Sequence, residues 1–234
     1  LRLLPSGFAV LLALPFLKRK WTIAKGDFFW FFIFTVVDAS LFQIFLAKGL
    51  AETGAGLGSV LIDSQPLMVA LLARILFGDA INPFGWIGLI LGLVGIICLG
   101  VPPELLNNWF LMGEVVSDSS FLSHGESWML AAAIAMAFGT VLIRFACRES
   151  DPVAVTGWHM FLGSIPLLIW HYFDENISFW PNWSSFEWGL MAYASLFGSA
   201  LAYGLFFWFA NREELTTFST LAFLTPVFAL GTGG

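Results

Sequence analysis

The stretch FGWIGLILGLVGIICLGV, residues 84–101, contains no charged side chain. An α-helix rises about 1.5 Å per residue, so about 20 apolar residues cross the roughly 30 Å hydrocarbon core of a bilayer. Transmembrane β-strands would instead show alternating segments of about ten residues. The chain is therefore predicted to be an all-α integral membrane protein with eight spans, near residues 1–17, 28–48, 56–77, 84–101, 127–146, 153–171, 188–210 and 215–230.

The overall composition supports the same class. Hydrophobic residues make up 59% of the chain and charged residues 11%, with a mean hydropathy of +0.85. A soluble domain carries about 25% charged residues, so a soluble protein is excluded. The 10 Lys and Arg residues form no basic face, and we expect no nucleic-acid partner. Cys98 and Cys147 lack metal-site spacing and no nucleotide-binding loop occurs, so no cofactor or metal is expected.

The connections between the predicted spans alternate in charge. The two longest, 102–126 and 172–187, contain no Lys or Arg. The other set of connections, with the adjoining helix ends, holds Lys18, Arg19, Lys20, Lys25, Arg74, Arg144, Arg148 and Arg212. Since basic loops stay on the side of synthesis, this set is predicted to face the cytoplasm or the stroma.

Two segments of the chain repeat each other. SVLIDSQPLMVA (59–70) aligns without gaps on STLAFLTPVFAL (219–230), so that Pro66 matches Pro226. These segments lie in the third and eighth spans, which cross the membrane in opposite directions. Inverted repeats with matching Pro breaks are typical of transporters. Two five-helix repeats would make ten helices, of which the eight spans are helices two to nine, and both ends of the chain are expected to be cut.

Short motifs over nearly the whole chain also carry a family resemblance. They are Arg2-Leu3-Leu4-Pro5, Val37-Asp38-Ala39 with Phe42-Gln43, Gly56-Leu57-Gly58-Ser59-Val60, Ile62-Asp63-Ser64-Gln65-Pro66-Leu67, Thr156-Gly157-Trp158-His159-Met160, Phe197-Gly198-Ser199-Ala200 and Phe223-Leu224-Thr225-Pro226. The chain resembles the drug/metabolite transporter superfamily with EamA-type repeats, most closely the Walls-Are-Thin-related plastid proteins and their cyanobacterial relatives. The resemblance implies a first repeat at 1–101, an outer loop at 102–126, a second repeat at 127–234, and movement of a small organic solute.

Two acidic residues lie inside predicted spans. Asp38 is near the middle of its span, and Asp63 lies about 10 Å inside the next. A buried charge costs at least about 2.5–3.5 kcal/mol in a membrane helix, so such residues mark partners or pathways. Ser59, Asp63 and Pro66 share one helix face, where Pro66 is expected to kink the helix. We hypothesise that Asp63, with Asp38, binds a coupling proton or a cationic group of the solute. The alternative is a carboxyl hydrogen-bonded to a neighbouring helix.

Other polar residues are weaker candidates for the pathway. His159 either titrates in a cavity or packs while donating to a carbonyl. The remaining candidates are Gln43, Gln65, Ser199, Tyr203 and the matching Pro226. A rival class is an intramembrane serine hydrolase built on Ser164 or Ser199 with His159, but no catalytic motif accompanies these residues. A non-transporting membrane scaffold is a third alternative.

The sequence therefore favours a secondary transporter working by alternating access rather than an enzyme. Its partners are a small solute and the lipid bilayer, and proton coupling is left open. We expect it in a bacterial plasma membrane or a plastid envelope. Gly85, Gly88, Gly92 and Gly95 form a stripe that suits close helix packing, either within the chain or in a homodimer.

Overall fold

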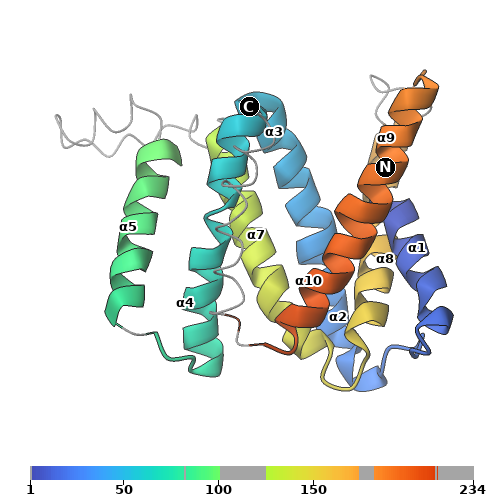
Figure 1. The fold of residues 1–234 in the computed structure, drawn as a ribbon, viewed down its shortest axis with the longest axis horizontal. Coiled ribbons are helices and arrows are strands. Elements are labelled where there is room, and N and C mark those ends of the chain that lie inside the picture. The colour runs from blue at the N-terminus through green and yellow to red at the C-terminus, as the bar shows by residue number, and fades with distance from the viewer. Residues whose placement is uncertain (1, 82, 101–124, 174–181, 214, 216–234) are drawn as a thin grey trace. The chain divides into compact units, whose positions relative to one another are not determined.

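All regular secondary structure in the described part of the chain is helical. A computed structural model describes residues 2–81, 83–100, 125–173, 182–213 and 215 (Figure 1). The elements in these ranges are α1 (Leu3–Phe16), η1 (Lys25–Asp27), α2 (Phe28–Phe34), η2 (Thr35–Leu41), α3 (Phe42–Ile62), α4 (Gln65–Phe77), α5 (Pro83–Gly100), α7 (Gly125–Ala146), α8 (Pro152–Phe173), α9 (Ser185–Ser195), η4 (Leu196–Leu201) and α10 (Ala202–Ala210). Four helical runs in this part of the chain are long and apolar enough to cross a bilayer: Lys25–Thr53, Gly125–Ala146, Pro152–Phe173 and Ser185–Ala210.

Most predicted spans coincide with observed helices. The helices α1, α5, α7, α8 and the run α9–η4–α10 begin and end within three residues of the predicted spans at 1–17, 84–101, 127–146, 153–171 and 188–210. Of the eighth span, 215–230, only Leu215 belongs to the described residues, and most of the predicted outer loop lies outside them. The count of eight spans in a ten-helix protein stays a prediction.

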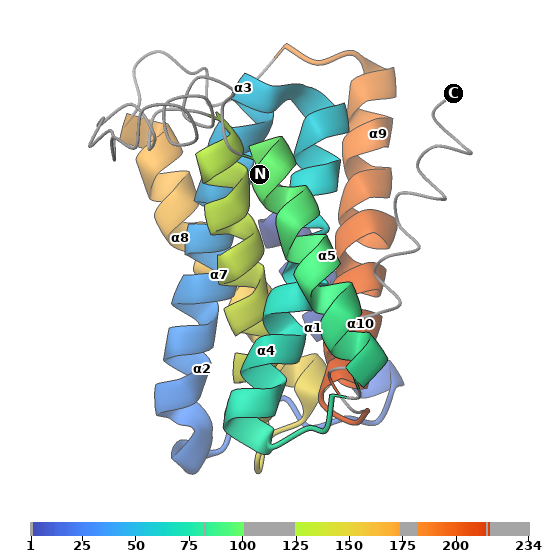
Figure 2. The same ribbon diagram turned by 90° about the vertical axis from the view of Figure 1, so that its left-hand side faces the viewer.

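The predicted turn between the second and third spans lies inside a helix. α3 runs from Phe42 to Ile62 without a break in its helical backbone, yet it folds back near its middle (Figures 1 and 2). A Cβ built on Gly58 would lie 2.7 Å from Leu50 Cδ2, whereas a straight helix separates these residues by about 12 Å. The glycines of this stretch allow the bend because they lack a Cβ. The reversal predicted from the sequence is present, but not as a loop.

Residues 1–41 and 138–213 form one compact unit. Its helices α1 and α8 pack closely, because a Cβ at Gly7 would lie 2.5 Å from the backbone nitrogen of Phe161. Leu11, Leu14 and Ala154 continue the contact as a buried apolar cluster. Glycine at position 7 is therefore required by the approach of the two backbones.

Two helical runs of the first unit point in opposite directions. The run α2–η2 and the run α9–η4–α10 are antiparallel in both views (Figures 1 and 2). Phe34 of the first run and Phe207 of the second meet edge to face, with ring centroids 5.1 Å apart. The unit thus contains two oppositely directed helices that share an aromatic contact.

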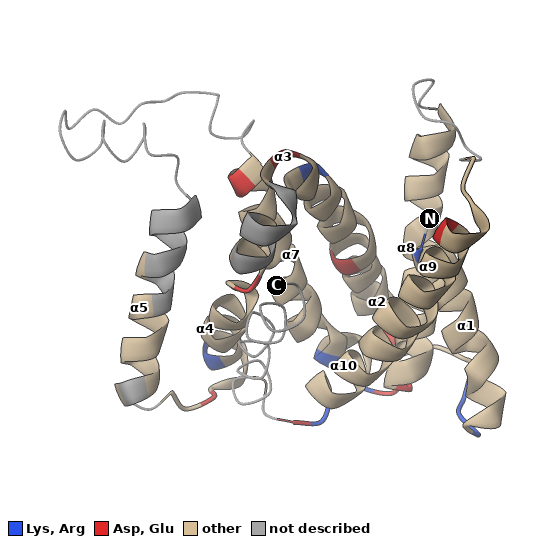
Figure 3. Cartoon of the chain, turned by 45° about the horizontal axis from the view of Figure 1, so that its top comes forward, with Lys and Arg blue, Asp and Glu red and all other residues tan. Residues whose placement is uncertain are grey.

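Polar connections tie the basic end of the first unit together. Basic residues colour the chain after α1 and after α10 at the same end of the unit (Figure 3). Arg19 pairs with Asp151 at 2.8 Å, and the other carboxylate oxygen of Asp151 accepts from the Val153 N–H at the start of α8. The buried Asp27 accepts from Ser150 Oγ at 2.7 Å. The carboxylates of Asp27 and Asp151 therefore hold the connections before α2 and before α8 in place.

The second unit holds residues 42–137, with α3, α4, α5 and the first part of α7. The Lys48 ammonium lies over the Trp128 ring, 4.7 Å from its centroid. α3 ends at Ile62 and α4 begins at Gln65, so the helix breaks at Asp63. The break lies just ahead of Pro66, whose ring removes a backbone donor. The kink predicted at this proline is confirmed.

Candidate functional site

A π-helical segment, η2, carries Asp38 into the interior of the first unit. π-segments are rare and frequently accompany functional sites. The Ser40 hydroxyl donates to the Gly163 carbonyl of α8 at 3.1 Å. A Cβ at Gly163 would collide with Ala39, so the missing side chain lets η2 lie directly on α8. The segment is therefore held in register with α8.

The carboxyl group of Asp38 contacts the imidazole of His159. Asp38 Oδ2 lies 3.0 Å from His159 Nε2, and the two side chains are 0% and 1% exposed. His159 Nδ1 lies 2.7 Å from the Thr156 carbonyl oxygen. A carbonyl only accepts hydrogen bonds, so Nδ1 carries a proton and donates it there. This bond fixes the imidazole, and Nε2 is left to face the carboxyl group.

The geometry of this pair requires one shared proton. With Nδ1 protonated, Nε2 either accepts from a protonated Asp38 or, as part of an imidazolium, donates to an ionised Asp38. Removing that proton would leave a lone pair facing a carboxylate oxygen across 3.0 Å. Such an arrangement is repulsive in a buried site. The pair is therefore chemically able to bind and release a single proton, provided that the side chains move apart when the proton leaves.

Aromatic rings and a glycine close the pair off. The Phe34 and Phe207 rings lie 4.3 Å and 5.4 Å from the imidazole, centroid to centroid. On the other side a Cβ at Gly139 of α7 would collide with Asp38 Oδ1. That oxygen has no hydrogen-bond partner among the described residues. The carboxyl group thus keeps one unused acceptor in a tightly packed, apolar surrounding.

The end of α9 and the second π-segment, η4, place Ser195 and Ser199 in the interior of the same unit. Ser195 is 3% exposed and Ser199 is 0% exposed, and neither hydroxyl has a partner in the described part of the chain. Ser6 of α1 donates to the Ser195 carbonyl at 2.9 Å. Tyr203 packs on Phe207, with ring centroids 5.8 Å apart. The predicted pathway residues Ser199 and Tyr203 therefore lie on η4 and α10, next to the aromatic contact around His159.

Other predicted pathway residues belong to the second unit. Asp63 lies in the break between α3 and α4, and its Oδ2 is buried without a partner among the described residues. Gln65 and Pro66 are buried at the start of α4, and Gln43 is half-buried near the start of α3. The side chain of Ser59 and all of Pro226 lie outside the described residues.

Sequence reasoning paired Asp38 with Asp63 and missed the partner that Asp38 has in the structure. The two aspartates lie in different units, and the contact of Asp38 is with His159, 121 positions along the chain. One signal was available, because a carboxyl group inside a membrane segment needs a partner and His159 is the titratable residue near the middle of another span. What the sequence lacked was the register of η2 against α8.

A bundle of apolar helices with buried polar groups is what a membrane transporter requires, and the sequence of the chain matches a known transporter family. Residues 1–101 and 123–233 match the EamA-like transporter family. The chain belongs to this family. Membership confirms the resemblance found in the motifs, and with the apolar helices it supports an integral membrane protein of a transporter family.

Individual EamA-family relatives cover nearly all of the chain. An "uncharacterized transporter" of Synechocystis is 49% identical over 98% of this chain and 70% of its own length. A chloroplastic WAT1-related protein of Arabidopsis thaliana is 43% identical over 97% of this chain and 54% of its own length. An "uncharacterized transporter" of Bacillus subtilis is 25% identical over 98% of this chain. The chain thus spans about half of the length of the Arabidopsis relative. No solved structure matches the chain.

The contacts of His159 argue against Ser164 as the nucleophile of the rival serine hydrolase in this EamA-family chain. Both imidazole nitrogens are engaged, by the Thr156 carbonyl and by Asp38. The Ser164 hydroxyl donates to the Phe161 carbonyl of its own helix at 2.7 Å. A serine nucleophile needs a base that accepts its proton. In this conformation His159 does not serve Ser164 as that base.

Proposed function

We propose that the chain is a secondary transporter that moves a small organic metabolite by alternating access, with Asp38 and His159 carrying a coupling proton. The observation that carries the proposal is the buried contact of 3.0 Å between Asp38 Oδ2 and His159 Nε2, which needs one shared proton. A transporter couples to protons when a site gains and loses a proton as its access changes. A pair that is stable only when protonated meets that requirement.

The two π-segments support the inverted repeat on which alternating access would rest. The alignment of Ser59 with Ser219 pairs each residue with the one 160 positions later. With this offset, the first π-segment, Thr35–Leu41, corresponds to positions 195–201. The second π-segment covers nearly the same positions, Leu196–Leu201. The runs that contain them point in opposite directions (Figure 2). Neither π-segment entered the alignment, so their coincidence is independent support for ten helices in two repeats.

The same offset brings predicted pathway residues into correspondence. Gln43 falls on Tyr203, and Ala39 falls on Ser199. Equivalent positions of inverted repeats line a common pathway when one half rocks against the other. We therefore assign Gln43, Ser199 and Tyr203 to the solute pathway, with Ser59, Gln65, Pro66 and Pro226 on the repeated helices that flank it.

Asp63 is proposed as a second site for the proton or for a cationic group of the solute. Its Oδ2 is buried without a partner among the described residues, and it lies at the break between α3 and α4. Broken helices at membrane depth commonly bind the transported ion or solute.

The compartment follows from the relatives and from the distribution of charge. Two of the relatives come from a cyanobacterium and a chloroplast. We place the chain in a bacterial plasma membrane or a plastid envelope, with the basic connections on the cytoplasmic or stromal side. A homodimer through the glycine stripe of α5 stays a prediction.

A flux assay tests the proposed function. The purified protein is reconstituted into vesicles with an imposed pH gradient and offered amino acids, nucleosides, auxin-like acids and polyamines in turn. Accumulation of one class above the level in protein-free vesicles supports a transporter. A chemical product in place of accumulation would support the enzyme, and neither result in a folded protein would support the scaffold.

A further inference from the structure

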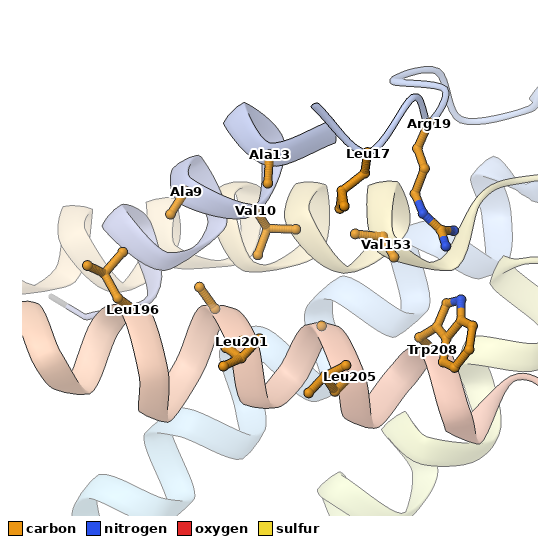
Figure 4. Close-up of a pocket in the computed structure, with 12 residues that line it drawn as sticks. Ala9, Val10, Ala13, Leu17, Arg19, Val153, Leu196, Leu201, Leu205 and Trp208 are labelled. Carbon is orange, nitrogen blue, oxygen red and sulfur yellow. The ribbon is translucent and has the colours of Figure 1, made fainter. Parts of the chain in front are cut away.

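The first unit has a groove on its surface that the proposed transport does not use. Its cavity measures about 450 Å³ and lies between α1, the start of α8 and the run η4–α10 (Figure 4). Leu17, Leu196, Leu201 and Leu205 line it and are each 49–56% exposed. Apolar side chains that are half open in the described part of a membrane protein suit a surface that faces lipid.

The length of the groove suits one lipid chain. Its wall on η4–α10 extends from Leu196 to Trp208, which corresponds to about 18 Å along a helix. One leaflet contributes about 15 Å of hydrocarbon to the bilayer. A single acyl chain would therefore fill the groove from the membrane interface to about the midplane.

One end of the groove is polar. Arg19 and Trp208 lie together at that end, and their nitrogens point toward each other (Figure 4). Trp208 Nε1 is buried and has no acceptor among the described residues. The Arg212 guanidinium lies 4.2 Å from the Trp208 ring centroid. Two cations and one unsatisfied N–H donor thus meet where the apolar wall ends.

The charge at this end favours an anion. Arg19 Nη1 donates to Asp151 at 2.8 Å, which holds the guanidinium at the groove and leaves its other donors available for an anion. Lys18 and Lys20 flank Arg19 in sequence and are exposed. With Arg212 this makes four cations, against the carboxylate of Asp151 that pairs with Arg19 and that of Glu213, which follows Arg212 in sequence. Basic pockets between membrane helices bind anionic head groups on the basic side of a bilayer.

We propose that this groove is a binding site for an anionic glycerophospholipid of the leaflet at the basic end. One acyl chain lies along the leucine wall, and the phosphate accepts from Arg19 and from Trp208 Nε1. The bound lipid bridges α1 to α10, two helices that belong to different repeats in the proposed function.

Native mass spectrometry of the purified full chain in detergent tests the site, with phosphatidylglycerol and phosphatidylcholine as probes. The wild type is expected to bind phosphatidylglycerol about tenfold more tightly, because both lipids offer the phosphate but only phosphatidylcholine adds a choline cation, which the basic side chains repel. Arg19→Gln removes that preference. Lys25→Gln, which removes the same charge from an exposed residue that takes no part in the groove or its cationic end, retains it.

A second pair of variants tests the groove itself. No atom lies within 4 Å of a Cβ built on Gly204 or on Gly198, and of these two only Gly204 lines the groove. Gly204→Phe is expected to abolish retention of phosphatidylglycerol, and Gly198→Phe to leave it unchanged. Equal retention of the two lipids by the wild type, or equal loss in both glycine variants, would overturn the proposal.

Discussion

The Asp38 carboxyl group and the His159 imidazole face each other across 3.0 Å in the interior of one helical unit. The contact joins η2 to α8, and it supplies the partner that a carboxyl group needs at membrane depth. His159 is held from its other side by the Thr156 carbonyl. The pair therefore links two helices, and in the proposed function it is also the site of the coupling proton.

Gly139→Ala is expected to break this pair, because the added methyl group would collide with Asp38 Oδ1. Overpacking of this kind costs about 1–3 kcal/mol. The variant should unfold at a lower temperature in detergent and lose pH-dependent transport. Gly189→Ala is the matched control, since its Cβ meets no atom within 4 Å. Indistinguishable behaviour of the two variants would show that Asp38 does not rest against Gly139.

Asp63→Asn should abolish pH-dependent uptake while leaving expression intact. The amide keeps the size of the carboxyl group but cannot ionise, so a proton or a cationic solute loses its binding group. The measurement is uptake into vesicles at several pH values with the solute found in the flux panel. Glu52→Gln, an exposed position of the same unit, is expected to match the wild type. Uptake by Asp63→Asn with an unchanged pH profile would exclude Asp63 from coupling.

Asp27→Ala should destabilise the first unit. The Asp27 carboxylate accepts from Ser150 Oγ at 2.7 Å and from the Glu149 N–H at 2.9 Å, and it is 2% exposed. Its loss leaves two donors without an acceptor, at a cost of about 1–3 kcal/mol. Thermal unfolding in detergent measures the change. Asp27→Asn keeps one acceptor oxygen, so its unfolding temperature is expected to lie between those of the wild type and of Asp27→Ala. A wild-type midpoint for Asp27→Ala would contradict the assignment.

Cys147 should be unreactive in the folded protein. It lies in the turn after α7, and burial raises the pKa of its thiol, an effect increased by the nearby carboxylates of Asp27 and Asp151. A raised pKa keeps the thiol protonated at pH 7.5. An increase of one in the pKa lowers the fraction of reactive thiolate about tenfold. Maleimide labelling in a Cys98→Ala background should be slow in detergent and fast in denaturant, and its rate should rise only at alkaline pH. Equal rates in both solvents would contradict the burial of this thiol.

The sequence predicted the helices well because apolar length and turn residues are local signals. The bounds of α7 and α8 follow directly from them. Long-range register has no such signal, so the contact between Asp38 and His159 could not be predicted. The π-segments were missed for a related reason, since a single extra residue in a helical turn leaves the apolar pattern almost unchanged. The fold-back within α3 was predicted as a loop because its glycines are equally common in turns.

Proton movement driven by the solute tests the central claim most directly. Vesicles loaded with a pH-sensitive dye receive the wild type, Asp38→Asn or His159→Gln, and the solute identified in the flux panel is added outside. The account predicts that the wild type acidifies or alkalinises the lumen as solute enters, and that both variants move solute without moving protons. Proton movement by Asp38→Asn and His159→Gln at the wild-type rate would contradict it.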